Sequence, residues 1–170
     1  MLACLSLPLR RLVLGAVLLA APLAQADFND GIAAFAAGDY AQAMAIFQPL
    51  ATTSNHAYAQ YFLGRMYLEG RGTDKDPAAA AKWLRKAAEQ GVKEAQYQMG
   101  KLYLQGEGVP KDRAQAYGWL SCAAHRGSPR AQEALAALQL TGEEKAGAET
   151  LARDLIAKYG STPRSTRVDR

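Results

Sequence analysis

The sequence predicts an all-α fold, an α-solenoid of antiparallel helix hairpins stacked side by side. Three observations predict it: an internal repeat of 36 residues, apolar residues at helical spacing inside each repeat, and capping residues at matching places in both copies. The composition agrees, because the 170 residues are 49% hydrophobic and 21% charged, as is typical of one globular domain.

The repeat is visible when residues 57–91 are aligned with residues 93–127 without a gap. Glycine, tyrosine and tryptophan recur at the same places in both copies. We expect these recurring residues to be structural: Gly64, Tyr67, Trp83, Gly91, Gly100, Tyr103, Trp119 and Gly127. Such agreement indicates that each copy is one supersecondary unit.

Each unit is predicted to form two helices. In the first unit, one helix runs from Ala57 to about Glu69, and Gly70 supplies the left-handed residue that ends it. The second helix follows Asp76-Pro77, an N-cap with proline at the first helical position, and ends at Gly91.

Small and large residues are placed as close helix packing requires. Gly64 and Gly100 stand inside helices, where glycine costs up to about 1 kcal/mol relative to alanine, so we expect them to permit close approach of a partner helix. We expect Trp83 and Trp119 to be core residues that fill the space between neighbouring hairpins.

Both units resemble the Sel-1-like repeat, a relative of the tetratricopeptide repeat, in the pattern A-x-x-x-L-G-x-x-Y-x-x-G-x-G, then D, then A-x-x-W-x-x-x-A-A-x-x-G. The resemblance covers residues 57–92 and 93–128. It implies a tetratricopeptide/Sel-1-like superhelix, in which the first helices line a concave side that binds peptides or proteins.

The flanks extend the array. Residues 27–56 are predicted to form a degenerate tetratricopeptide-like helix pair, with helices at 28–37 and 40–52. Residues 129–159 are predicted to form a partial repeat and a C-terminal capping helix, which a capping box from Thr141 to Glu144 opens. The tail, residues 160–170, is predicted to be disordered.

The N-terminal segment, residues 1–26, has the features of a signal peptide. Arg10 and Arg11 precede an apolar run over residues 12–24, which ends in the small-x-small sequence Ala24-Gln25-Ala26. The run is too short to span about 30 Å of hydrocarbon as a helix. We expect cleavage after Ala26, a periplasmic location and no membrane span in the mature chain. An uncleaved anchor or a buried first helix is the alternative.

The sequence contains no catalytic motif, metal-ligand cluster or phosphate-binding loop that we recognise. His56 and His125 stand alone and are expected at the surface. Cys122 would be the only cysteine of the mature chain, so no internal disulfide could form. The net charge of +4 is too small to favour nucleic acid. We expect no enzyme activity, cofactor or metal.

The first helices carry the candidate partner-binding residues, which lie on one helical face: Tyr58, Tyr61, Arg65, Leu68, Glu94, Tyr97, Lys101 and Leu104. Tyr61 and Tyr97 recur at equivalent positions, so an alternative is that they complete the hairpin packing. Tyr58, Arg65, Glu94 and Lys101 are freer to specify a partner.

The sequence therefore predicts a non-catalytic periplasmic protein-protein interaction module, an adaptor or regulator that binds a protein or peptide partner in a concave groove. One alternative is a cell-envelope scaffold associated with peptidoglycan or polysaccharide. Another is β-lactamase-like activity, as in cysteine-rich Sel-1-like proteins, which the single mature cysteine and the lack of a Ser-x-x-Lys motif disfavour.

Overall fold

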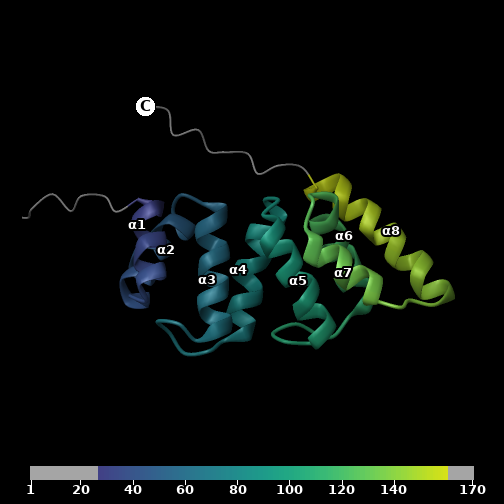
Figure 1. The fold of residues 1–170 in the computed structure, drawn as a ribbon, viewed down its shortest axis with the longest axis horizontal. Coiled ribbons are helices and arrows are strands. Elements are labelled where there is room, and N and C mark those ends of the chain that lie inside the picture. Colours follow the sequence, from purple (N-terminus) through teal and green to yellow (C-terminus); the bar gives the residue numbers. More distant parts are fainter. Residues whose placement is uncertain (1–26, 161–170) are drawn as a thin grey trace, which may run out of the picture.

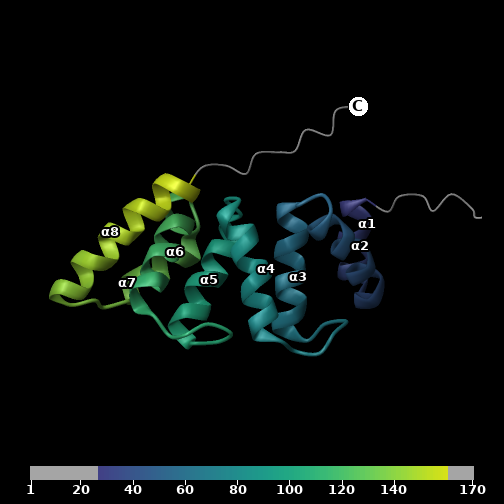
Figure 2. The same cartoon turned by 180° about the vertical axis from the view of Figure 1, so that it is seen from behind.

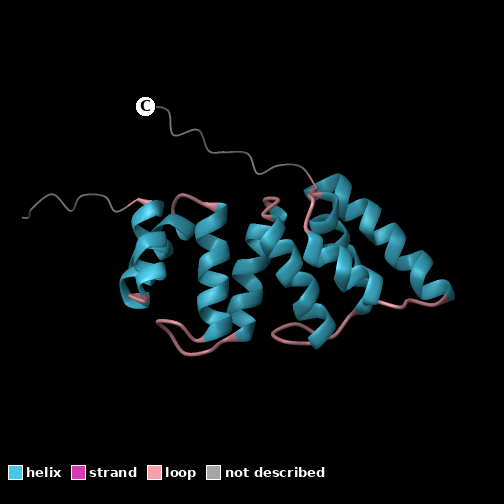
Figure 3. Cartoon of the chain, in the orientation of Figure 1, coloured by secondary structure: helices cyan, strands magenta, loops and turns pink. Residues whose placement is uncertain are grey.

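The computed structural model describes residues 27–160, which fold into eight α-helices and no strand. In chain order these are α1 (Phe28–Ala37), α2 (Tyr40–Thr52), α3 (Ala57–Glu69), α4 (Pro77–Glu89), α5 (Lys93–Gln105), α6 (Arg113–His125), α7 (Pro129–Ala137) and α8 (Gly142–Tyr159). They follow one another along the long axis of the molecule (Figure 1), joined by loops (Figure 3). The all-α class is confirmed. The predicted signal peptide and residues 161–170 of the predicted tail lie outside the described residues.

Local chemistry sets the ends of the two central hairpins. The Asp76 carboxylate accepts from the Ala79 N–H at 2.9 Å, and Asp112 accepts equivalently from Gln115 at 2.9 Å. Each first helix ends at a glycine in the left-handed region, Gly70 or Gly106, with φ of 67° and 71°. The loop between the helices is closed by a backbone bond from the capping aspartate to a tyrosine carbonyl, Tyr67 in the first unit and Tyr103 in the second, at 2.9 and 3.0 Å. Gly91 and Gly127 follow the second helices with φ of 84° and 76°.

Two glycines bring the helices of each hairpin into close contact. A Cβ built on Gly64 would lie 2.6 Å from Leu84 Cγ, and one built on Gly100 would lie 2.6 Å from Leu120 Cγ. Both separations are far shorter than a van der Waals contact, so a larger residue at either position would force the leucine or its helix to shift.

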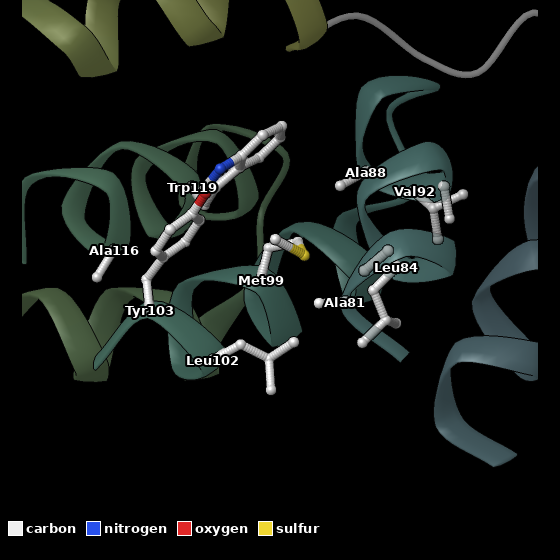
Figure 4. Close-up of a cluster of buried hydrophobic side chains, with 11 residues drawn as sticks. Ala81, Leu84, Ala88, Val92, Met99, Leu102, Tyr103, Ala116 and Trp119 are labelled. Carbon is white, nitrogen blue, oxygen red and sulfur yellow. The ribbon is translucent and has the colours of Figure 1, made fainter. Parts of the chain in front are cut away.

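The core runs through the array as buried apolar side chains that neighbouring hairpins share. Its central cluster includes Leu84 and Ala88 of α4, Met99 and Tyr103 of α5, and Trp119 of α6 (Figure 4). Leu84, Met99 and Trp119 each expose no more than 1% of their surface. Packing between consecutive hairpins therefore stabilises the array, as expected for a solenoid.

The two tryptophans differ in burial, although both were expected in the core. Trp119 is 1% exposed, whereas Trp83 is half-buried, and the Lys86 Nζ lies 4.5 Å from the centroid of its ring. The cause is α8, whose Tyr159 stacks on Trp119. No comparable side chain from residues 27–160 is stacked on Trp83.

Helix α8 packs mainly against α6 rather than beside α7 (Figures 1 and 2). Its last turn is held by side chains from two other elements. Gln96 Nε2 donates to the Tyr159 carbonyl at 2.9 Å, and an Arg126 guanidinium nitrogen donates to the Gly160 carbonyl at 3.3 Å. The helix thus covers the side of α6 that would otherwise face water.

The predicted capping box of α8 is wrong. Thr141 is the N-cap residue, but its side chain makes no capping hydrogen bond. Glu144 forms an ion pair with Arg113 of α6 at 2.9 Å instead of reaching back to Thr141.

Among the helices of residues 27–160, none has the length and apolar character that crossing a membrane would need.

Candidate functional site

A cavity of about 350 Å³ lies on the face formed by α3, α5 and α7, which we call the first-helix face. Its lining comes from α3, from α5 and from the start of α7: Tyr61, Lys93, Glu94, Tyr97, Gln98, Ser128, Pro129 and Arg130. Three of the predicted partner-binding residues, Tyr61, Glu94 and Tyr97, therefore meet in one place.

The other five lining residues were not among those predicted from the sequence. Arg130 could have been found, because it stands 36 positions after Glu94 and continues the repeat into α7. Ser128 and Pro129 were interpreted only through their role at the start of the helix, where Ser128 Oγ accepts from the Ala131 N–H at 3.4 Å. No repeat signal marks Lys93 or Gln98 as lining residues.

The cavity carries charges of both signs. Lys93 and Arg130 are cationic and Glu94 is anionic, and none of the three belongs to an ion pair within residues 27–160. A bound group could therefore engage them without breaking an ion pair between side chains of the described residues. The rings of Tyr61 and Tyr97 supply rigid apolar area between these charges.

Tyr61 and Tyr97 are both packing and lining residues. Tyr61 packs against the central core cluster and meets Phe62 edge to face at 5.4 Å, whereas Tyr97 packs against a cluster that includes Leu120 and Ala131. Burial raises the pKa of the Tyr61 hydroxyl, an effect that the nearby Arg65 partly opposes. Each of the two residues therefore packs against the core and also lines the cavity.

Arg65 is held within the protein, in contrast to the expectation that it is free to specify a partner. Its guanidinium pairs with Glu69 at 3.1 Å and lies 5.3 to 6.0 Å from three aromatic ring centroids. Glu69 also pairs with Arg71 at 2.6 Å. The cluster links α1, α3 and the loop that follows α3, because one of those rings is Phe35.

The other predicted partner-binding residues lie outside the cavity. Tyr58 is 42% exposed at the start of α3, and Lys101 Nζ lies 6.0 Å from the Tyr97 ring centroid. Leu68 and Leu104 are half-buried and pack against core clusters.

The two histidines and Cys122 show no arrangement typical of a catalytic or metal site within the described residues. His56, expected at the surface, is half-buried: its Nδ1 accepts from the Ala59 N–H at 3.2 Å and its ring stacks on Phe28 at 4.5 Å. Burial raises the pKa of the Cys122 thiol to about 12, so it stays protonated at neutral pH. His125 is exposed. No group of three His, Cys, Asp or Glu residues within 27–160 is placed to hold a metal ion.

Comparisons with known proteins agree with this architecture. A family model described as Sel1 repeat matches residues 57–92 and 93–128. A search of curated proteins gives no match. One similar solved structure is a protective antigen present in uropathogenic Escherichia coli strains that displays an SLR fold; it is 34% identical over 78% of this chain, with a TM-score of 0.74.

A second similar structure is a Sel1 repeat protein from Oxalobacter formigenes, 29% identical over 76% of this chain, with a TM-score of 0.62. This chain spans 30% of the length of the first protein and 56% of the second. The likeness confirms the α-solenoid, and Sel1 repeats indicate a protein-protein interaction module. Residues 57–128 are therefore two Sel1 repeats, folded as consecutive helix hairpins.

Proposed function

We propose that this protein is a non-catalytic periplasmic adaptor or regulator that binds a protein or peptide partner on its first-helix face. One observation carries the proposal: two consecutive hairpins and the helix that follows them, α7, contribute to a single cavity lined by aromatic and charged side chains. A site built across several repeats suits an extended partner, because such a partner can contact each hairpin in turn.

The chemistry of the cavity favours a polypeptide. Tyrosine rings offer contact area at low conformational cost, and arginine pairs with carboxylates in a fixed geometry. Lys93, Glu94 and Arg130 together provide both donors and acceptors. A chain with mixed charges would satisfy all three, whereas a uniformly charged ligand would oppose at least one of them.

The surroundings of the nucleophilic groups support the non-catalytic part of the proposal. The Cys122 thiol is buried and protonated at neutral pH, and the His56 imidazole caps α3. A nucleophile needs access to substrate and an adjacent base, and Cys122 lacks the access.

The signal peptide predicted from the sequence of residues 1–26 supports the periplasmic part. The described fold begins at Asp27, whose carboxylate caps α1 through the N–H groups of Asn29 and Asp30. Cleavage after Ala26 would therefore leave every helix of the array whole. We expect the protein isolated from the periplasmic fraction to begin at Asp27, which N-terminal sequencing would establish; a protein retaining residues 1–26 would contradict this.

Site-specific photo-crosslinking in living cells tests the binding face. A photoreactive amino acid at Gln98, inside the cavity, should give a discrete protein adduct that disappears when Tyr97→Ala and Arg130→Glu are added. The same amino acid at Gln48, which is exposed on α2, is the matched control. Equal adducts from both positions, or an adduct with envelope glycan in place of protein, would refute the proposal.

A further inference from the structure

Helices α4 and α6 occupy equivalent places in the two repeats, yet their outer sides differ in burial. On α6 the side that faces α8 consists of buried residues, Gly118, Trp119 and Cys122. On α4 the equivalent residues are exposed or half-buried: Lys82, Trp83 and Lys86. The same helix face is thus covered in one repeat and open in the other.

The chain itself shows what covers this face. On α6 the cover is an amphipathic helix, α8, whose apolar side chains meet the small residues of α6. A Cβ built on Gly118 would lie 2.7 Å from Leu155 Cδ1, and the ring of Tyr159 stacks on that of Trp119. An aromatic residue on the covering helix thus shields the tryptophan from water.

The open face of α4 contains a cavity of about 570 Å³, larger than the one on the first-helix face. Its lining is apolar between cationic side chains: Ala78, Ala79, Ala81, Lys82, Trp83, Arg85, Lys86, Gly108 and Val109. Arg85 donates to the Tyr103 hydroxyl and so is engaged within the protein. Lys82 and Lys86 form no ion pair within residues 27–160.

We propose that this face of α4 binds an acidic amphipathic helix from a partner protein. An apolar side chain of the partner would stack on Trp83 as Tyr159 stacks on Trp119, and carboxylates beside it would pair with Lys82 and Lys86. The partner helix must be acidic, because covering this face removes the ammonium groups of Lys82 and Lys86 from water. That desolvation is costly unless carboxylates pair with them. Helix-in-groove recognition uses such regularly spaced apolar anchors.

The lysines also exclude the chain's own cap from this place. On α6, Leu155 of α8 fits beside Gly118 because glycine has no side chain. On α4 the position equivalent to Gly118 is Lys82, whose side chain would occupy the space that Leu155 needs. In the free protein Lys86 lies over the Trp83 ring, and we expect it to swing from the ring to a partner carboxylate on binding. This surface is formed by α4 and the loop before α6, and it does not depend on the first-helix face.

Synthetic peptides provide the test. Three helical peptides match the 18-residue length of α8: one with a leucine stripe flanked by glutamates, one with the same stripe flanked by lysines, and one acidic peptide with its leucines scattered around the helix. Tryptophan emission reports binding, because the chain has two tryptophans and Trp119 is already buried. We expect only the acidic amphipathic peptide to bind, with a blue shift that Trp83→Phe removes.

Charge reversal makes the test specific. Lys82→Glu with Lys86→Glu should weaken binding of the acidic amphipathic peptide about tenfold or more and confer binding of the basic peptide. Lys145→Glu with Arg153→Glu makes the same charge change on exposed residues of α8 and should leave both affinities unchanged. Circular dichroism checks that each variant is folded.

Four outcomes would overturn the proposal. They are failure of the acidic amphipathic peptide to bind, equal binding of the scattered peptide, equal loss of affinity in both charge-reversed variants, and binding of phosphatidylglycerol vesicles through Lys82 and Lys86 in place of the peptide.

Discussion

The indole ring of Trp119 stacks on the phenol ring of Tyr159, with ring centroids 5.6 Å apart and ring planes inclined by 19°. The contact joins α6 to the last turn of α8. Its neighbours are apolar, since Leu155 and Tyr159 both pack against the central core cluster. The cap is thereby part of the core.

This contact predicts unequal costs for truncating the two tryptophans. Trp119→Ala should lower the free energy of unfolding by about 3 to 5 kcal/mol, the usual cost of removing a buried aromatic side chain. Trp83→Ala should cost only about 1 to 2 kcal/mol, because Trp83 is half-buried. Urea unfolding followed by circular dichroism measures both, and equal losses would contradict the role assigned to α8.

Gly100→Ala should destabilise the protein although alanine favours helices by about 1 kcal/mol. The new Cβ would lie 2.6 Å from Leu120 Cγ and 3.3 Å from the Ala116 carbonyl oxygen, so α5 and α6 would have to separate. We expect a net loss of about 1 to 3 kcal/mol in the free energy of unfolding.

Gly147→Ala is the matched control for that prediction. Gly147 lies inside α8, and a Cβ built there has no neighbouring atom within 4 Å. This substitution should stabilise the protein by up to about 1 kcal/mol. If thermal unfolding showed both variants to be stabilised, close packing at Gly100 would not be the reason for its glycine.

The sequence could predict the helix ends, because they depend on neighbouring residues. The carboxylate of Asp76 accepts a hydrogen bond from an N–H three residues away, and Gly70 takes the left-handed conformation that commonly ends a helix. The docking of α8 could not be predicted in the same way. It depends on Gly118 leaving room for Leu155, a contact between residues far apart in the sequence that no local pattern encodes.

Only part of the candidate site could be predicted, because repeat spacing does not encode contacts between hairpins. Repeat spacing placed Tyr61 and Tyr97 on one face, and the cavity brings them together. The same spacing could not show that the Arg65 guanidinium lies 5.3 Å from the ring centroid of Phe35, a residue of the neighbouring hairpin. Periodicity gives the face on which a side chain lies, whereas its partners depend on residues that do not repeat.

His56 should make stability depend on pH. Burial lowers the pKa of its imidazole below the ordinary 6.5, and its Nδ1 can accept from Ala59 only when that nitrogen is unprotonated. Well above pH 6.5 the imidazole is neutral in both folded and unfolded chains, so the His56 contribution is constant. As the pH falls through 6.5 the unfolded chain takes up the proton first, so stability decreases until the folded pKa is passed.

His56→Asn should retain a capping side chain and remove this part of the pH dependence. The measurement is the free energy of unfolding between pH 7.5 and 5.5 for the wild type and the variant. His125→Asn is the control, because His125 is exposed in the last turn of α6. The assignment to His56 would be wrong if His125→Asn, and not His56→Asn, flattened the profile.

Arg65 and Lys101 occupy equivalent positions in the two repeats, but their replacement by glutamate should have different effects. Arg65→Glu would place a carboxylate beside Glu69 and remove a cation from three aromatic rings, so we expect a loss of about 1 to 2 kcal/mol in stability. Lys101→Glu removes only a cation 6.0 Å from the Tyr97 ring centroid and should change stability by less than about 0.5 kcal/mol.

Lys101→Glu is therefore the cleaner probe of partner binding, because a weaker complex in this variant cannot be attributed to unfolding. We expect it to reduce crosslinking from Gln98 while the melting temperature stays close to that of the wild type. Arg65→Glu should reduce both together. Unchanged crosslinking in Lys101→Glu would show that the partner does not extend from the cavity along α5, and would confine it to the side chains around Tyr61 and Arg130.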